Sequence, residues 1–269
     1  MKRLELFEFE DFNWLPTVIR TGVTNLIKVL HNLIGTRELL SNIVMSCLET
    51  TDFKQIVDLG SGSGGPMIAV IQHLNSKRKT DKPIKLLLTD KYPNNQIVQR
   101  INSLNLPNIS YSETSVDAAA IEHTPHGLKT MIASFHHMAP DTAKRILKSA
   151  EKSGSPILIY EIAENNIPFI IWLLLLPISL AILILMSLVL TLFVWPLSIA
   201  QIIFTYLIPI IPLVYAWDGQ ASLMRTYTLK DVEELIGTEH KPDYNWKIQQ
   251  AKKPNGKKAG YYVFGYPNY

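Results

Sequence analysis

Cysteine is almost absent from this sequence, because Cys47 is the only one in 269 residues. A single thiol excludes an internal disulfide and a zinc site built from several cysteines, and it favours a reducing compartment. Apart from one adjacent pair, the histidines are scattered without ligand spacing, so we predict no metal site. The N-terminus carries acidic residues where a signal peptide needs an apolar core, and no cleaved leader is expected.

Strong net charge is also missing. Lys and Arg number 26 against 23 Asp and Glu, which gives a formal net charge of +3. No dense basic stripe with interleaved aromatic residues occurs, so we expect no nucleic-acid partner. Within the chain, residues 167–216 form a block that contains no Asp, Glu, Lys, Arg or His. A bilayer core needs about 20 apolar residues per helical crossing, so this block is long enough for two helices and a turn.

The apolar block interrupts what otherwise reads as one folded domain, so both of its ends must lie on the same side of a bilayer. We predict an inserted helical hairpin over residues 167–216 with a turn near Trp195–Ser198. Two full crossings are one interpretation. A shallow, re-entrant hairpin is the second, favoured by Gln201 and by the prolines inside the block. A soluble lid or a dimer face is the third, and it fits poorly with so long a stretch without ionisable groups.

Strand and helix patterns alternate in the rest of the chain. Strands are predicted at residues 55–60, 84–90, 109–115, 128–137, 156–162, 244–251 and 260–266. Helices are predicted at 17–34, 36–49, 66–76, 95–104, 142–153 and 228–236. This order predicts an α/β fold with a doubly wound, mostly parallel sheet and a closing hairpin. The expected domains are an N-terminal helical cap (1–50), a Rossmann-like core (51–166), the insertion (167–216) and the remainder of the core (217–269).

The sharpest local motif is the glycine-rich loop after the first predicted strand, which reads DLGSGSGG from Asp58. Its glycines allow a tight turn and a close approach of a cofactor to the backbone. Gly60, Gly62 and Gly65 fit the dinucleotide pattern, whereas Gly60, Gly62 and Gly64 fit the loop of S-adenosylmethionine sites. Asp58 favours the second pattern, because a carboxylate suits a cationic amino-acid group and sits poorly beside a pyrophosphate.

Two more acids follow the next two predicted strands. Asp90 is placed to accept both ribose hydroxyls, and Asp117 is placed to meet an adenine amino group. With these acids the pattern resembles class I S-adenosylmethionine-dependent methyltransferases, over roughly residues 50–165 and 225–266. The resemblance implies a seven-stranded Rossmann-like sheet that ends with an antiparallel strand, and S-adenosylmethionine as cofactor. The implied cofactor-binding residues are Asp58, Gly60, Ser61, Gly62, Gly64, Asp90, Lys91, Asp117 and Ser134.

A narrower resemblance spans nearly the whole chain. The stretches FEFEDFNWLP, ASFHHM and TYLIPIIPLVYAWDGQASLMRTYT look like those of a bacterial, membrane-associated subgroup of these methyltransferases. This resemblance indicates neither the methyl acceptor nor the oligomeric state. The apolar block, the lone cysteine and the basic residues near the block predict membrane attachment with the catalytic domain in the cytoplasm, which in a bacterium means the inner membrane.

Methyl transfer is an in-line displacement in which the protein aligns a nucleophile and can remove its proton. His136 and His137, at the end of the fourth predicted strand, are candidates for a base acting on an oxygen or nitrogen nucleophile. They can equally shape the cofactor pocket. If the strand continues through them, they point to opposite faces and only one reaches the substrate. Glu161, at the end of the fifth strand, is the third catalytic candidate.

Beyond the apolar block, Trp217, Asp218, Arg225 and Tyr227 are candidate substrate contacts. The alternative is an interfacial anchor with an ion pair between Asp218 and Arg225. We therefore predict a membrane-associated S-adenosylmethionine-dependent methyltransferase that acts on a lipid or an amphipathic small molecule. An NAD(P)-dependent oxidoreductase is one alternative, although a Tyr-x-x-x-Lys pair is missing near the fourth strand. A non-catalytic membrane scaffold that binds S-adenosylmethionine is the other.

Overall fold

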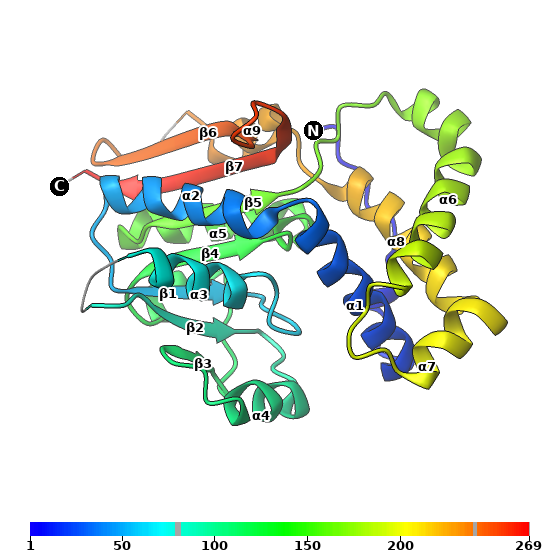
Figure 1. Cartoon of the computed structure of the whole chain (residues 1–269). Helices are drawn as coiled ribbons and strands as arrows, with labels where there is room; N and C mark the ends of the chain where they lie inside the picture. Colours follow the sequence, from blue (N-terminus) through cyan, green and yellow to red (C-terminus); the bar gives the residue numbers. More distant parts are fainter. Residues whose placement is uncertain (79–81, 239–240, 269) are drawn as a thin grey trace. The chain divides into compact units, whose positions relative to one another are not determined.

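The computed structural model describes residues 1–78, 82–238 and 241–268, and it divides into two compact units (Figure 1). We call them the core unit and the hairpin unit. The core unit comprises Met1, Thr36–Glu164 and Leu229–Tyr269, and the hairpin unit comprises Lys2–Gly35 and Asn165–Thr228. The two units thus meet along the chain at 35/36, 164/165 and 228/229, and the domains predicted from the sequence end at residues 50, 166 and 216.

The core unit is built on a seven-stranded sheet with the order β3-β2-β1-β4-β5-β7-β6. The strands are β1 (Gln55–Leu59), β2 (Lys85–Thr89), β3 (Ile109–Tyr111), β4 (Leu128–Ile132), β5 (Ile157–Glu161), β6 (Tyr244–Lys252) and β7 (Lys258–Pro267). β1 to β5 run parallel to one another, and β7 is antiparallel to both β5 and β6. The predicted doubly wound sheet with a closing antiparallel hairpin is therefore confirmed.

Helices cover the sheet of the core unit (Figure 1). They are α2 (Thr36–Thr50), α3 (Met67–Lys77), α4 (Asn95–Ser103), α5 (Pro140–Ser153) and α9 (Leu229–Ile236), with short 3-10 turns η2 (Ile121–His123) and η3 (Phe135–His137). α2, α3 and α4 share one apolar cluster with the strands, in which Leu40, Ile71 and Ile101 meet Ile56 and Leu88. α2 belongs to the core unit because its apolar side chains cover strand residues on this face of the sheet that would otherwise be exposed to water.

The fourth strand is shorter than predicted, since β4 ends at Ile132. Ala133 adopts φ +51°, a left-handed conformation that non-glycine residues rarely take, and its N–H donates to the carbonyl of Tyr160 at 2.7 Å. The chain then turns into η3. The predicted strand over residues 128–137 is therefore too long, and the condition under which His136 and His137 would point to opposite faces is not met.

The hairpin unit is helical throughout its regular elements. They are η1 (Phe9–Asp11), α1 (Thr17–Leu33), α6 (Phe169–Thr191), α7 (Ile199–Ile202), the π-helix η4 (Ile203–Leu207) and α8 (Ile210–Arg225). α6 packs along α8, and the predicted turn lies between α6 and α7. α8 continues past Ala216 to Arg225, so the ionisable residues that follow the apolar block lie on the same helix as its end.

By length and composition, α6 is the one described helix that passes as a membrane span. A second candidate is the pair Ile199–Leu207 and Ile210–Arg225, which is bent by 77°. The hairpin unit also has an apolar interior of its own, where Ile19 and Leu26 of α1 meet Leu190 and Ile211. α1 therefore folds with the inserted hairpin.

Candidate active site

The loop between β1 and α3 contains four glycines with positive φ: +71° at Gly60, +50° at Gly62, +106° at Gly64 and +53° at Gly65. L-residues rarely adopt these angles, which explains the glycine content of the motif. A Cβ at Gly62 would meet nothing within 4 Å, whereas a Cβ at Gly64 would lie 2.9 Å from Ile101 Cδ1. The loop thus presents open backbone at Gly62 and packs tightly at Gly64.

Asp58 lies buried beneath this loop, and both carboxylate oxygens accept hydrogen bonds. Thr130 Oγ1 donates to Oδ1 at 2.6 Å, and Ser61 Oγ donates to Oδ2 at 2.7 Å. Burial raises the pKa of Asp58 to about 6, although the bonds from Thr130 and Ser61 oppose the shift. In the structure Asp58 holds the loop in place, and its predicted contact with the cofactor's cationic end stays a prediction.

Asp90 and Tyr111 hold the open part of the loop. The Gly62 N–H donates to Asp90 Oδ2 at 3.0 Å, and the Tyr92 N–H donates to Asp90 Oδ1 at 2.8 Å. From β3, the Tyr111 hydroxyl donates to the Gly62 carbonyl at 2.9 Å. The Asp90 carboxylate therefore lies beside the exposed glycine backbone, where the sequence places the ribose.

Asp117 forms a surface ion pair with Lys91, whose Nζ donates to Asp117 Oδ2 at 2.8 Å. The ammonium group beside it holds the pKa of Asp117 below its ordinary value, and Asp117 in turn raises the pKa of Lys91. Asp117 Oδ1 also accepts the Ala119 N–H at 2.9 Å. The side chain is thus ionised, in the form that accepts a hydrogen bond from an adenine amino group.

Ser134 supplies an observation that favours a bound cofactor. Its Oγ is buried without a hydrogen-bond partner in the parts of the chain that the structure describes. The same atom would lie 3.8 Å from a Cβ built on Gly60. Buried hydroxyls normally have partners, so an orphaned one beside the glycine loop fits the predicted polar ligand.

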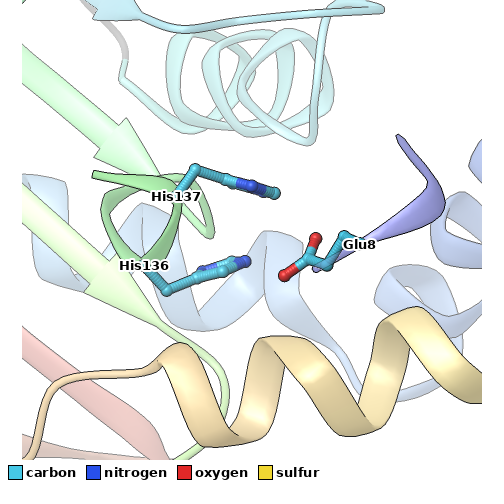
Figure 2. Close-up of side chains that lie close together, drawn as sticks. All are labelled: Glu8, His136 and His137. Carbon is cyan, nitrogen blue, oxygen red and sulfur yellow. The ribbon is translucent and has the colours of Figure 1, made fainter. Parts of the chain in front are cut away.

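The chemistry-bearing side chains lie at the ends of β4 and β5. The rings of His136 and His137 are neighbours, with centroids 4.2 Å apart and planes inclined by 35° (Figure 2). Glu161 Oε2 lies 2.9 Å from His136 Nδ1, and the His136 N–H donates to Glu161 Oε1 at 3.0 Å. A carboxylate at Nδ1 favours the tautomer with the proton there, which places the ring's lone pair on Nε2. This pairing is the geometry of an oriented base.

The four predicted substrate residues lie in the hairpin unit, where they contact the N-terminal segment. Asp218 accepts the N–H groups of Phe9 and Glu10 at 2.7 and 3.2 Å. Trp217 Nε1 donates to the Phe7 carbonyl at 2.9 Å. Arg225 forms ion pairs with Asp11 at 2.5 Å and with Glu8 at 3.3 Å. The Arg3 guanidinium lies 5.1 Å from the centre of the Tyr227 ring. These contacts give the residues a structural role in holding residues 3–11 on α8, and their role as substrate contacts stays a prediction.

Sequence reasoning missed the residues that support the loop and those that meet α8. Thr130 could have been noticed, because it is a hydroxyl residue in β4, a strand whose residues are all buried. Tyr111 and the acids of the N-terminal segment gave no such signal, since their partners lie far away in the sequence.

Sequence comparison does not find a relative: no protein-family model matches the chain, and no curated protein matches it either. Solved structures do match its fold. The plantazolicin methyltransferase BpumL in complex with SAH superposes with a TM-score of 0.54 at 14% identity, covering 94% of this chain and 96% of that chain. The plantazolicin methyltransferase BamL, with a triazolic desmethylPZN analog and SAH, gives 0.50 at 14% identity, covering 94% and 99%.

At such identities the likeness establishes the fold. The chain has the fold of class I S-adenosylmethionine-dependent methyltransferases, as its sequence predicted. The glycine loop, with Asp90 beside it, occupies the β1–α3 connection of that fold, where open α/β sheets bind ligands. Fold and loop together support the predicted enzyme class and its cofactor.

Proposed function

We propose that this protein is an S-adenosylmethionine-dependent methyltransferase that works at a membrane and methylates a lipid or an amphipathic small molecule. The observation that carries the enzyme class is the glycine loop in this fold, with the Asp90 carboxylate on its open backbone. The orphaned hydroxyl of Ser134 beside Gly60 supports the same cofactor.

The pair of His136 and Glu161 supplies the base. Glu161 fixes the imidazole, and Nε2 takes the proton from a hydroxyl or amine of the acceptor. S-adenosylmethionine, when bound, would supply an electrophilic methyl group and would leave as S-adenosylhomocysteine with the electrons of the carbon–sulfur bond, while His136 holds the acceptor's proton. The ring of His137 lies beside that of His136, with the centroids 4.2 Å apart.

The membrane half of the proposal comes from the hairpin unit. α6 is 23 residues long, with 11% of its most apolar window buried. The chain enters the hairpin unit at Asn165, with only three residues between it and Glu161. The unit that we propose to contact the membrane is thus joined by a short connection to the strand that carries the base's partner.

A labelled methyl donor identifies the acceptor. Membranes with and without the protein are incubated with the donor, and the lipid extract is separated and counted. We expect label in one lipid or amphipathic fraction that depends on the protein. Donor binding without transfer to lipid or to lysate would instead favour the S-adenosylmethionine-binding scaffold, and retention of the protein on membranes after a carbonate wash tests the location.

The cofactor assignment has its own test in Asp90→Ala. Hydrogen bonds to a charged group are worth about 1.5–3 kcal/mol, so donor affinity should fall roughly 10- to 100-fold. Calorimetric titration with S-adenosylhomocysteine measures the change. Asp141→Ala, which removes an exposed acid elsewhere in the core unit, is the control. Tight binding that survives Asp90→Ala would contradict the assignment.

A further inference from the structure

The hairpin unit exposes an unusual amount of apolar surface. Ile170, Leu174 and Ile178 of α6 are 70%, 73% and 61% exposed, and Trp195 in the following turn is 92% exposed. The apolar block that carries them has no Asp, Glu, Lys, Arg or His to form a charged rim. Soluble monomers rarely show contiguous surface of this kind, and acyl chains are the occupant that needs no polar partner groups.

Helix α1 is attached to the end of the hairpin that includes the turn. Gln201, in α7 just after the turn, donates from Nε2 to the Gly22 carbonyl at 3.4 Å and accepts from Asn25 Nδ2 at 3.3 Å. Gly22 has no side chain to obstruct α8, and a Cβ there would lie 2.3 Å from Ile211 Cδ1. Wherever the turn lies in a bilayer, the first half of α1 must lie with it.

The outer face of α1 is polar. Thr21, Lys28 and Asn32 are exposed, in a helix whose opposite face packs on the hairpin. Arg20 adds a second cationic group, and its guanidinium donates to the carbonyls of Glu10 and Phe12. Such a face suits water and is costly in hydrocarbon.

A full crossing would force α1 through the bilayer as well. The chain returns from α1 to the core unit after Gly35, so the two ends of this helix would lie on opposite sides. Seventeen residues of helix reach about 25 Å at 1.5 Å per residue, against a hydrocarbon core of about 30 Å. Arg20 and Lys28 would then lie inside that core.

We infer that the hairpin unit lies in one leaflet and does not cross the bilayer, with α6 and the turn against acyl chains and the polar face of α1 toward water. This inference rests on the membrane association in the proposed function, and it selects the shallow hairpin over two crossings. The 77° bend between Ile199–Leu207 and α8 agrees with it, because these segments do not form a straight span.

The test is the sidedness of a cysteine on the outer face of α1. Thr21→Cys protein is reconstituted into sealed vesicles, and a membrane-impermeant maleimide is added outside or trapped in the lumen. Lys257→Cys, in the exposed β6–β7 turn, reports the side that holds the core unit. The native Cys47 is 1% exposed and needs no replacement. We expect both introduced cysteines to react with the same reagent, at rates within about tenfold of each other since both are exposed.

Two results would overturn the inference. Labelling of Thr21→Cys and Lys257→Cys from opposite sides, in protein that stays on the membrane after a carbonate wash, would establish a crossing and leave the proposed function standing. Release by the wash, together with a cross-linked dimer, would assign the apolar surface to a second copy of the chain and would contradict the membrane half of the proposed function.

Discussion

The two units differ in how far their apolar residues are exposed to solvent. In the core unit every residue of β5 is buried, and apolar side chains of the strands meet those of α2 to α4. In the hairpin unit α6 shows most of its apolar residues on the surface, and only Trp172, Ser187, Leu190 and Thr191 are buried. Apolar residues in the core unit are buried against one another, so water is excluded. The apolar residues of α6 are exposed, so they need an apolar partner from outside the described chain.

The sharpest test of the comparison is Glu161→Gln, which addresses chemistry in the core unit. The amide loses the charge that holds the His136 Nδ1–H, so the ring loses its fixed tautomer. General-base catalysis contributes typically 10²–10⁴-fold, and the rate of methyl transfer to membrane extract should fall by about that factor with donor affinity unchanged. Initial rates over a pH series measure it.

Glu164→Gln is the matched control, because it removes the next carboxylate in the chain, which accepts from Gln250 Nε2 at 3.3 Å. An equal loss of rate in the two variants would show that Glu161 acts only by supporting the fold. A normal rate in Glu161→Gln would remove it from the mechanism.

The next largest effect should come from a charge on α6. Leu174→Asp places a carboxylate on a side chain that is 73% exposed. An acid at depth in a membrane costs about 2.5–3.5 kcal/mol, so the membrane-bound fraction should drop by roughly two orders of magnitude in partition coefficient. Sedimentation with vesicles measures it. Leu104→Asp makes the same change at a 59% exposed leucine of the core unit and should have no effect. An equal membrane-bound fraction in the two variants would contradict the proposal that the hairpin unit, and not the core unit, contacts the membrane.

Asp58 tests whether the interior of the core unit excludes water from a buried carboxyl. Its pKa is raised from 3.8 to about 6, so the folded state favours the neutral carboxyl. The stability that this group contributes is fully present below pH 3.8 and is lost as the pH rises through 6. Two pKa units correspond to about 3 kcal/mol, and Asp58→Asn should escape that loss because an amide does not ionise.

Urea denaturation of wild type and Asp58→Asn across that pH range measures the difference. The free energy of unfolding of the variant should gain on the wild type as the pH rises, because the hydroxyls of Thr130 and Ser61 can hydrogen-bond to an amide too. If the free energies of unfolding of the two proteins change with pH in parallel, burial does not raise the pKa of Asp58.

The sequence predicted the core sheet well, because βα alternation and apolar strands are local signals. It also placed Asp58 near the end of β1 and Asp90 directly after β2. The third strand was predicted over 109–115 but ends at Tyr111, so Asp117 follows it only after an irregular segment. The prediction also failed at β4, where Ala133 takes a left-handed conformation for which its residue type gives no hint. The contact between Phe9 and Asp218 joins residues 209 positions apart, and no periodicity reveals it.

The smallest effect should come from the surface ion pair of Lys91 and Asp117. Their side chains are 53% and 43% exposed, so water and salt screen the attraction. Such pairs contribute about 0.2–1 kcal/mol, and Lys91→Ala should lower the free energy of unfolding by no more than that. Asp117→Ala should cost more in stability, because it also removes the acceptor of the Ala119 N–H, and it should weaken donor binding because it removes the acceptor for the adenine amino group. If calorimetry finds wild-type donor affinity in Asp117→Ala, the adenine is held by other residues.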